Sequence, residues 1–171
     1  TMTTYISTDK AQVFATAAHA AVGQVRKYDG APYIVHPIRV ANIVRTYGGD
    51  TAQISAAYLH DVVEDTHVTI DVIRDTFGDT IADLVDGLTD VSVASDGNRS
   101  TRKAMDRQHS ANATYEAQFV KCADIIDNAS DIAANDPKFW EIYRKEMTSL
   151  LEVMDKVKTT PIYAAAVKAV A

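Results

Sequence analysis

The stretch Leu59-His60-Asp61-Val62-Val63-Glu64-Asp65-Thr66 carries four polar side chains that can bind a metal ion or move a proton. It follows an apolar run whose spacing predicts a helix over Thr51–Glu64. Residues four apart are neighbours on a helix surface, so the histidine would lie beside the glutamate, and the first aspartate beside the second. A metal ion at the first turn would then face a carboxylate pair at the second, as metal-assisted hydrolysis requires. The alternative is a helix end with ordinary solvated charges.

The composition of the chain is typical of a globular protein. Its 171 residues are 47% hydrophobic and 23% charged, which suits a single domain over residues 1–171. The formal net charge of −6 gives no support to a nucleic-acid-binding surface, which normally shows a basic excess. No apolar run approaches the roughly 20 residues that span a bilayer. Together with the single cysteine, Cys122, and the lack of a signal-peptide pattern, this predicts a cytoplasmic protein that binds neither nucleic acid nor membranes.

Helical periodicity recurs along the chain and no sustained strand pattern occurs, so the predicted fold is all-α, a compact multi-helix bundle. Ser7 or Thr8 is a suitable N-cap for the first helix. Pro37 suits the first turn of the second helix, where a missing amide hydrogen has no partner to lose. The segment after Asp90 is a loop by composition. The predicted helices cover residues 8–25, 37–47, 51–64, 70–77, 79–89, 115–134, 139–157 and 161–171.

The apolar run from Ile162 to Val167, near the C-terminus, has two interpretations. It is a candidate contact for a homo-oligomer, and it equally suits a cap on the domain's own core. The sequence leaves both interpretations open.

Two further polar side chains stand out from apolar surroundings: His36, which precedes the helix that starts at Pro37, and Asp124, on a later helix. Each alone is a weak signal. A lone buried histidine is more often hydrogen-bonded core than a ligand, and Asp124 has a cationic neighbour in Lys121. Taken with His60-Asp61 they are more specific. Two imidazoles and two carboxylates form a mixed nitrogen and oxygen set that suits a borderline divalent ion such as Mn²⁺ or Zn²⁺, with positions left for water and substrate.

The motifs around these residues extend over most of the chain, from about Ala11 to Leu150. They are Arg26-Lys27, Pro32-Tyr33-Ile34-Val35-His36-Pro37, Leu59 to Thr66, Phe77-Gly78, Leu84-Val85-Asp86-Gly87-Leu88-Thr89 and Lys121-Cys122-Ala123-Asp124. Together they resemble the HD-superfamily hydrolase domain of RelA/SpoT enzymes, and more closely the stand-alone small alarmone hydrolases of the Mesh type. Members of that group remove the 3′-pyrophosphate from guanosine tetra- and pentaphosphate, usually with Mn²⁺. The chain has no room for the synthetase and regulatory domains of the long members, which implies a hydrolase-only protein acting on a small nucleotide.

The resemblance implies a role for each residue that matches a family motif. The metal ligands, for Mn²⁺ or another divalent ion such as Zn²⁺, would be His36, His60, Asp61 and Asp124. The catalytic pair would be Glu64 and Asp65, since a carboxylate one helical turn from the ligands can orient a water and accept its proton. The substrate-binding residues would be Arg26, Lys27, Asn128, Arg144 and Lys103. The alternative for the first two of these is a solvated loop, and for the last a charged helix face.

Two departures from the family pattern concern the base of the substrate. After Asp124 the chain reads Ile125-Ile126-Asp127-Asn128-Ala129-Ser130, which lacks the usual arginine and adds a carboxylate. Residues 92–112 also match poorly. An adenosine alarmone, (p)ppApp, is therefore an alternative to (p)ppGpp. An HD phosphohydrolase acting on deoxynucleoside triphosphates or monophosphates is a second alternative. A third is an antitoxin-like binding partner of an alarmone synthetase, against which the intact Glu64-Asp65 pair argues.

Overall fold

The computed structural model describes residues 2–171, and of residues 2–7 the backbone alone. The chain forms two compact units, Thr1–Thr89 and Asp90–Ala171. Over the described residues the secondary structure is helical, apart from one isolated bridge between Val25 and Pro32. The predicted all-α bundle is therefore confirmed. No helix in this part of the chain is both long and apolar enough to cross a bilayer.

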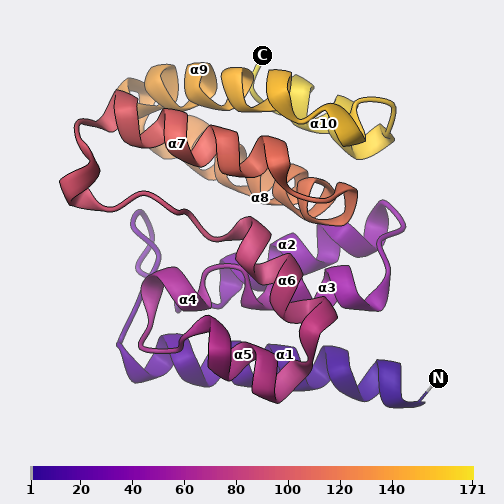
Figure 1. The fold of residues 1–171 in the computed structure, drawn as a ribbon. Helices are drawn as coiled ribbons and strands as arrows, with labels where there is room; N and C mark the ends of the chain where they lie inside the picture. The colour runs from indigo at the N-terminus through magenta and orange to yellow at the C-terminus, as the bar shows by residue number, and fades with distance from the viewer. Residues whose placement is uncertain (1) are drawn as a thin grey trace. The chain divides into compact units, whose positions relative to one another are not determined.

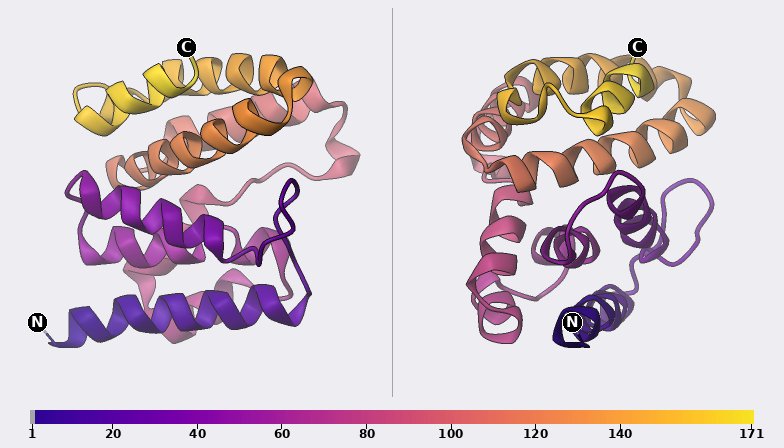
Figure 2. Two further views of the ribbon diagram at one scale, coloured as in Figure 1. Left: turned by 180° about the vertical axis from the view of Figure 1, so that it is seen from behind. Right: turned by 90° about the vertical axis from the view of Figure 1, so that its right-hand side faces the viewer.

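The first unit is built around helix α3, which packs against α1, α2 and α6 (Figures 1 and 2). Every residue of α3 from Gln53 to Leu59 is buried, as expected of a helix that is enclosed by other helices. Its start is fixed by Asp50, whose side chain accepts from the Gln53 amide in a capping box. The helices of this unit are α1 (Met2–Ala21), α2 (Val35–Thr46), α3 (Thr51–Leu59), α4 (Val62–Asp65), α5 (Ile70–Phe77) and α6 (Asp79–Leu88).

The ends of the first two helices differ from the predicted ones. Helix α1 already includes Ser7 and Thr8, so the predicted N-cap is wrong; the side chain of Ser7 lies outside the described residues. The helix ends at Ala21 because Gly23 adopts φ +66°, a left-handed conformation that closes the helix end. Helix α2 begins two residues before Pro37, which lies in its first turn as predicted.

The predicted helix over Thr51–Glu64 is interrupted, and this is the correction that matters most for the site. Helix α3 ends at Leu59, and α4 starts at Val62. His60 Nδ1 lies 2.7 Å from the carbonyl oxygen of Ala57. In a continuous helix that carbonyl would accept from the Asp61 amide, so the histidine side chain competes with the backbone at this point. His60 and Asp61 therefore lie in a turn between α3 and α4.

The second unit is built around α8, which packs against α9 and α10, while α7 packs against α9 and α8 (Figures 1 and 2). Side chains of Asn98, Thr114, Asp136 and Thr160 accept amide hydrogens at the starts of its four helices. The elements are η1 (Ala94–Asp96), α7 (Arg99–Asn112), α8 (Tyr115–Asn135), α9 (Pro137–Val153), η2 (Asp155–Val157) and α10 (Pro161–Ala169).

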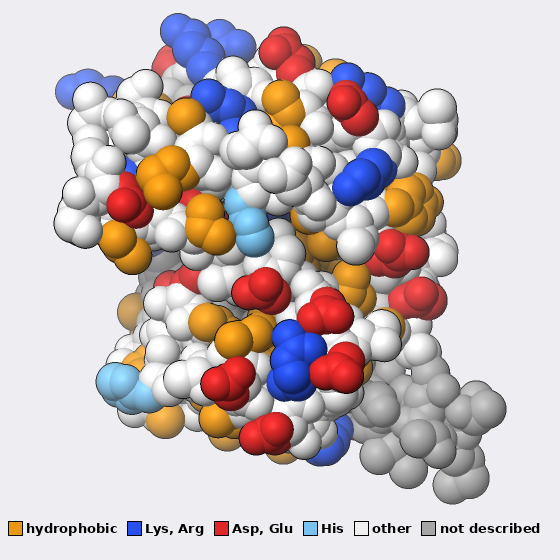
Figure 3. Space-filling view, in the orientation of Figure 1, with side chains coloured by type: hydrophobic (Ala, Val, Ile, Leu, Met, Phe, Trp, Pro, Cys, Tyr) orange, Lys and Arg blue, Asp and Glu red, His pale blue; other side chains and the backbone are white. Residues whose placement is uncertain are grey.

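Two features of this unit bear on the sequence predictions. Helix α7 is absent from the predicted set because it contains no buried residue and so shows no apolar stripe. Helix α10 buries Ile162 and Ala166 completely, which supports the interpretation of the C-terminal run as a cap on the unit's own core. Val167 is exposed, and the homo-oligomer contact stays a prediction. On the face shown in Figure 3, acidic, basic and apolar side chains are interspersed.

Candidate functional site

Three of the predicted metal ligands lie together in the first unit. Asp61 Oδ2 is 3.0 Å from His60 Nε2 and 3.7 Å from His36 Nε2. The two imidazole centroids are 5.2 Å apart, and both histidines are buried. Ligand atoms bound to one ion at about 2.1 Å lie about 3 to 4.2 Å from one another. The three side chains therefore have the spacing of a shared metal site.

The hydrogen bonding of His60 supports this interpretation. A backbone carbonyl only accepts, so His60 Nδ1 carries the hydrogen in its contact with Ala57. In the neutral ring Nε2 then has a lone pair, and it faces a carboxylate oxygen of Asp61 at 3.0 Å. Two acceptors at this distance repel each other unless a proton or a metal ion lies between them, so the contact suits either an imidazolium or a bound metal ion. A carbonyl partner on Nδ1 is also the usual support of a metal-binding histidine.

Tyr33 is a contributor that the sequence did not identify. Its hydroxyl donates to Asp61 Oδ2 over 2.6 Å, so the phenol holds the same oxygen that faces the histidines. The position of Tyr33 three residues before His36 was the available signal. The structure assigns this residue a hydrogen bond to a candidate ligand.

The predicted catalytic pair, Glu64 and Asp65, lies on α4 and is exposed. The Asp65 amide donates to the Asp61 carbonyl over 3.0 Å, which keeps the predicted one-turn relation in spite of the helix break. Gln24 Nε2 donates to Asp65 Oδ2 over 3.1 Å. Desolvation of the Asp65 carboxyl, and next the charge of Asp61, raise its pKa above the ordinary value, while the bond from Gln24 opposes the shift. The ionised carboxylate is therefore disfavoured here in the absence of a cation.

Replacing Asp65 with asparagine is expected to stabilise the metal-free protein at neutral pH by up to about 1 kcal/mol, the scale of exposed charge interactions. The raised pKa means that the folded state binds the Asp65 proton more tightly than the unfolded chain, so ionisation opposes folding. The gain should shrink as the pH falls through the raised pKa of the folded state, and vanish below the ordinary aspartate pKa, where both states are protonated. Urea unfolding of both proteins across this range measures it. A wild type that is the more stable protein at neutral pH would contradict the prediction.

The two basic residues before His36 lie in the loop after α1. The guanidinium of Arg26 lies over the Tyr33 ring, 5.8 Å from its centroid, and the Arg26 amide donates to the Ala31 carbonyl over 2.7 Å. Lys27 is exposed, and its ammonium lies 5.5 Å from the Tyr28 ring centroid. Arg26 thus contacts the tyrosine that binds Asp61, whereas Lys27 extends along the loop.

In the second unit, Asp124 is 5% exposed and has two side-chain partners on its own helix. Lys121 Nζ lies 2.8 Å from Asp124 Oδ2, and Asn128 Nδ2 donates to Asp124 Oδ1 over 3.1 Å. Burial lowers the pKa of the Lys121 ammonium, but the Asp124 and Asp90 carboxylates raise it further, so the net shift is upward. Asp124 and Asn128, four residues apart on α8, are therefore in contact, and the lysine stays charged beside them.

Replacing Lys121 with methionine is expected to destabilise the metal-free protein by about 3 kcal/mol, because it leaves a buried carboxylate without its cation. This is the lower end of the range for broken buried pairs, since the Lys121 side chain is 25% exposed. Chemical denaturation in the presence of a chelator gives the value. Lys158→Met is the matched control, because Lys158 and Asp155 form an exposed pair with the same three-residue spacing. That variant should lose much less stability, because exposed ion pairs contribute little, and equal losses in the two variants would contradict the account.

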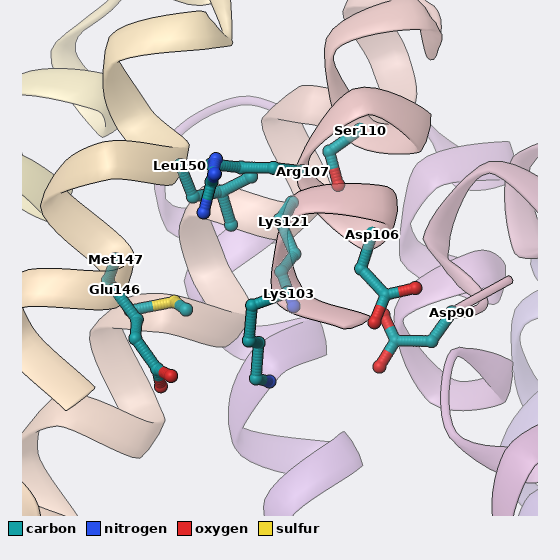
Figure 4. Close-up of a pocket in the computed structure, with 9 residues that line it drawn as sticks. All are labelled: Asp90, Lys103, Asp106, Arg107, Ser110, Lys121, Glu146, Met147 and Leu150. Carbon is teal, nitrogen blue, oxygen red and sulfur yellow. The ribbon is translucent and has the colours of Figure 1, made fainter. Parts of the chain in front are cut away.

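Lys103 lines a cavity of about 60 Å³ in the second unit. Figure 4 shows Lys103 and Lys121 between the carboxylates of Asp90 and Asp106 on one side and Glu146 on the other. Asp106 Oδ1 also accepts hydrogen bonds from the amides of Val91 and Ser92. These bonds hold the start of the loop after Asp90. Lys103 thus lines a small polar cavity, and it also lines a more open hollow together with Arg99, Arg107 and Lys145.

Arg144 lies on α9, where it forms an ion pair with Glu141 through Nε and Nη2 at 3.1 and 2.9 Å. Glu141 is 56% exposed. The structure therefore gives Arg144 a surface partner on its own helix, and its predicted contact with substrate stays a prediction.

Comparisons with known proteins agree on one family. A family model described as an HD domain matches residues 11–149. A probable guanosine-3′,5′-bis(diphosphate) 3′-pyrophosphohydrolase from Synechocystis is 48% identical over 83 residues, which are 48% of this chain and 10% of that protein. The Danio rerio protein named guanosine-3′,5′-bis(diphosphate) 3′-pyrophosphohydrolase MESH1 is 36% identical over 118 residues, 68% of this chain and 64% of that protein. The match thus spans less than two thirds of either relative.

The fold of a solved structure agrees with these relatives. It is described as a metazoan orthologue of SpoT that hydrolyses ppGpp and plays a role in starvation responses. It superimposes with a TM-score of 0.82 at 25% sequence identity, over 96% of this chain and 93% of that one. The chain therefore belongs to the HD-domain family, and within it is similar to the MESH1 proteins.

Proposed function

We propose that this protein is a metal-dependent hydrolase that removes the 3′-pyrophosphate from ppGpp-type alarmones. The observation that carries the proposal is the cluster of His36, His60 and Asp61, with the Glu64-Asp65 pair one turn further along the chain. The similarity of this chain to proteins named 3′-pyrophosphohydrolases supports the choice of substrate. We propose further that residues 1–171 act as one HD-type domain, since the family model covers parts of both units.

The metal ligands would be His36, His60 and Asp61 of the first unit and Asp124 of the second. The donor set of imidazole nitrogens and carboxylate oxygens fits Mn²⁺, with Zn²⁺ as the alternative. When bound, such an ion acts as a Lewis acid on the phosphoryl group and lowers the pKa of water. Tyr33 and the Ala57 carbonyl would keep Asp61 and His60 oriented toward it.

Glu64 and Asp65 would accept the proton of the attacking water. Attack on the 3′-linked phosphorus forms a new phosphorus–oxygen bond and breaks the bond to the ribose 3′ oxygen. Pyrophosphate leaves, and the ribose oxygen gains a proton. Two carboxylates in α4, beside the ligand Asp61, are suitably placed along the chain to accept the proton of the water.

The substrate contacts would be made by basic side chains and one amide. Arg26 and Lys27 carry positive charge that would stabilise the charge developing on the pyrophosphoryl group under attack. Lys103 and Arg144 would bind the remaining phosphates, and Arg144 can exchange Glu141 for a phosphate at little cost, because exposed ion pairs contribute little. Asn128 would contact the nucleoside. We propose (p)ppGpp as the substrate and (p)ppApp as the alternative, because Asp127 alters the family pattern next to Asn128.

The test is a panel of nucleotides incubated with the purified protein and Mn²⁺, with products separated by ion-exchange chromatography. The panel contains the guanosine and adenosine tetraphosphates, the standard triphosphates, their deoxy forms and the monophosphates. Release of pyrophosphate from a 3′-substituted nucleotide is the expected result. Turnover of 5′-substituted nucleotides alone would overturn the proposal in favour of a different HD phosphohydrolase. Binding of a synthetase with no turnover at all would favour the antitoxin-like partner.

Two further proposals follow from the sequence. We expect the protein to act in the cytoplasm on a small-molecule substrate, without nucleic acid or membrane as a partner. We also retain a homo-oligomer as a proposal, to be tested by sedimentation of the purified protein.

A further inference from the structure

Two hydrogen bonds join a buried histidine to Asp65 through one glutamine. His19 Nδ1 lies 2.9 Å from Gln24 Oε1, and Gln24 Nε2 donates to Asp65 Oδ2 over 3.1 Å. The three residues come from the last turn of α1, the loop that follows it, and the last residue of α4. This series of contacts therefore links separate segments of the first unit and ends on a carboxylate of the proposed catalytic pair.

The chemistry of these groups fixes the direction of both bonds. An amide oxygen only accepts, so His19 Nδ1 carries the hydrogen and donates it to Gln24. The amide nitrogen then faces the Asp65 carboxylate, which accepts. The reversed amide would place oxygen against oxygen at Asp65. His19 is 1% exposed, so the imidazole that orients the amide is itself held within the core.

The backbone of Gln24 is held on both sides. Its amide donates to the His19 carbonyl over 3.2 Å, and its carbonyl accepts from the Tyr33 amide over 3.2 Å. The first of these bonds closes the end of α1, where Gly23 takes the left-handed conformation that such a helix end requires. The Gln24 side chain therefore extends from a fixed point.

The same segment also holds Asp61. Tyr33, whose amide bonds to Gln24, donates its hydroxyl to Asp61 Oδ2 over 2.6 Å. The Tyr33 ring packs against His19, with the ring centroids 4.8 Å apart. Gln24 and Tyr33 thus contact two carboxylates, Asp61 and Asp65, which the backbone of α4 places one turn apart.

The orientation of the Asp65 carboxylate depends on side-chain contacts with other segments, because α4 has only four residues. A helix of one turn does not hold its shape alone, so the direction of the Asp65 carboxylate is set by side chains from other segments. In the described part of the chain, the side chain that bonds to this carboxylate is Gln24. The bond occupies Oδ2 and leaves Oδ1 to take part in proton transfer.

We propose that Gln24 is a positioning residue for hydrolysis: its amide, oriented by His19, holds the Asp65 carboxylate beside Asp61. The inference rests on the proposed function. Gln24 acts through Asp65 and contacts neither the ion nor the substrate. Its loss should therefore lower turnover while leaving metal content and substrate binding unchanged.

The test is Gln24→Met, which keeps the length of the side chain and removes both hydrogen bonds. We expect kcat on the best nucleotide of the panel to fall about 10-fold, the lower end of what the loss of a supporting hydrogen bond costs at metal sites. KM and bound Mn²⁺ per chain should stay as in the wild type. Gln24→Leu is the second variant, in case the first does not fold. Gln108→Met is the matched control, since Gln108 is an exposed glutamine that also donates to a side chain.

A second readout needs no activity. In the ¹⁵N–¹H correlation spectrum of imidazole nitrogens in the metal-free protein, His19 should carry its hydrogen on Nδ1, and this signal should move in Gln24→Met but not in Gln108→Met. An unchanged kcat in both Gln24 variants, or a fall in kcat matched by loss of metal, overturns the positioning role. So does a His19 hydrogen on Nε2 in the wild type. A wild type that hydrolyses no 3′-pyrophosphorylated nucleotide overturns the proposed function and this role together, and the imidazole signal then still shows whether the contact exists.

Discussion

Asp61→Ala should lose bound metal and turnover together. Asp61 Oδ2 is the atom that approaches both histidine Nε2 atoms, at 3.0 and 3.7 Å, so its removal leaves two imidazoles without their carboxylate partner. Loss of a group that only supports a ligand costs 10–100-fold in metal affinity, and loss of a ligand should cost more than about 100-fold. Metal analysis after loading with Mn²⁺, together with pyrophosphate release, measures both effects.

The control for this variant is Asp75→Ala, which removes an exposed aspartate from α5 in the same unit. It should keep the metal content and the turnover of the wild type. Retention of wild-type metal content by Asp61→Ala would show that the ion is held elsewhere, and would contradict the assignment of the ligand cluster.

Glu64→Ala is expected to keep its metal and to lose turnover by about 10²–10⁴-fold, the usual contribution of a positioned proton acceptor. Glu64 is an exposed residue of α4, so its removal creates no cavity and should leave the thermal stability nearly unchanged. The comparison of metal content with kcat separates a proton-transfer role from a ligand role. Glu152→Ala, at an exposed position on α9, is the control. A Glu64→Ala protein with full kcat would show that Glu64 takes no part in proton transfer.

The fold class followed from the sequence because most helices bury an apolar stripe. The predicted bounds 70–77 coincide with α5, and α6, in the predicted range 79–89, buries Ile81, Leu84, Val85 and Leu88. Helix α7 gave no such signal, since none of its residues is buried. Its start depends on the Asn98 cap, which accepts from the Thr101 amide. A cap of this kind is too common in loops to predict a helix alone.

The helix break before α4 could not be predicted, because it depends on a side chain bonding to the backbone. An uninterrupted apolar pattern favours a continuous helix, and the bond from His60 to Ala57 overrides it at Asp61. The ligand cluster was still predicted, since His60 and Asp61 are adjacent in the sequence. The contact of Asp61 with Tyr33 was missed, because it joins residues 28 positions apart.

The roles of the single residues stay predictions that chemistry must test. Asp124 and Asn128 lie four residues apart within one predicted helix, and their side chains are hydrogen-bonded. No sequence signal pointed to Gln24, whose importance depends on a turn at Gly23 that returns the chain to the end of α1. Spacing along one helix is therefore readable from a sequence, whereas contacts made across loops are not.

The central claim is hydrolysis at the 3′-linked phosphorus, and a single reaction in ¹⁸O-labelled water tests it directly. Guanosine tetraphosphate is incubated with the protein and Mn²⁺, and the products are analysed by ³¹P NMR and mass spectrometry. The account predicts one ¹⁸O atom in pyrophosphate and none in the guanosine diphosphate. Label in the nucleotide, or release of single phosphates from the 5′ end, would contradict it.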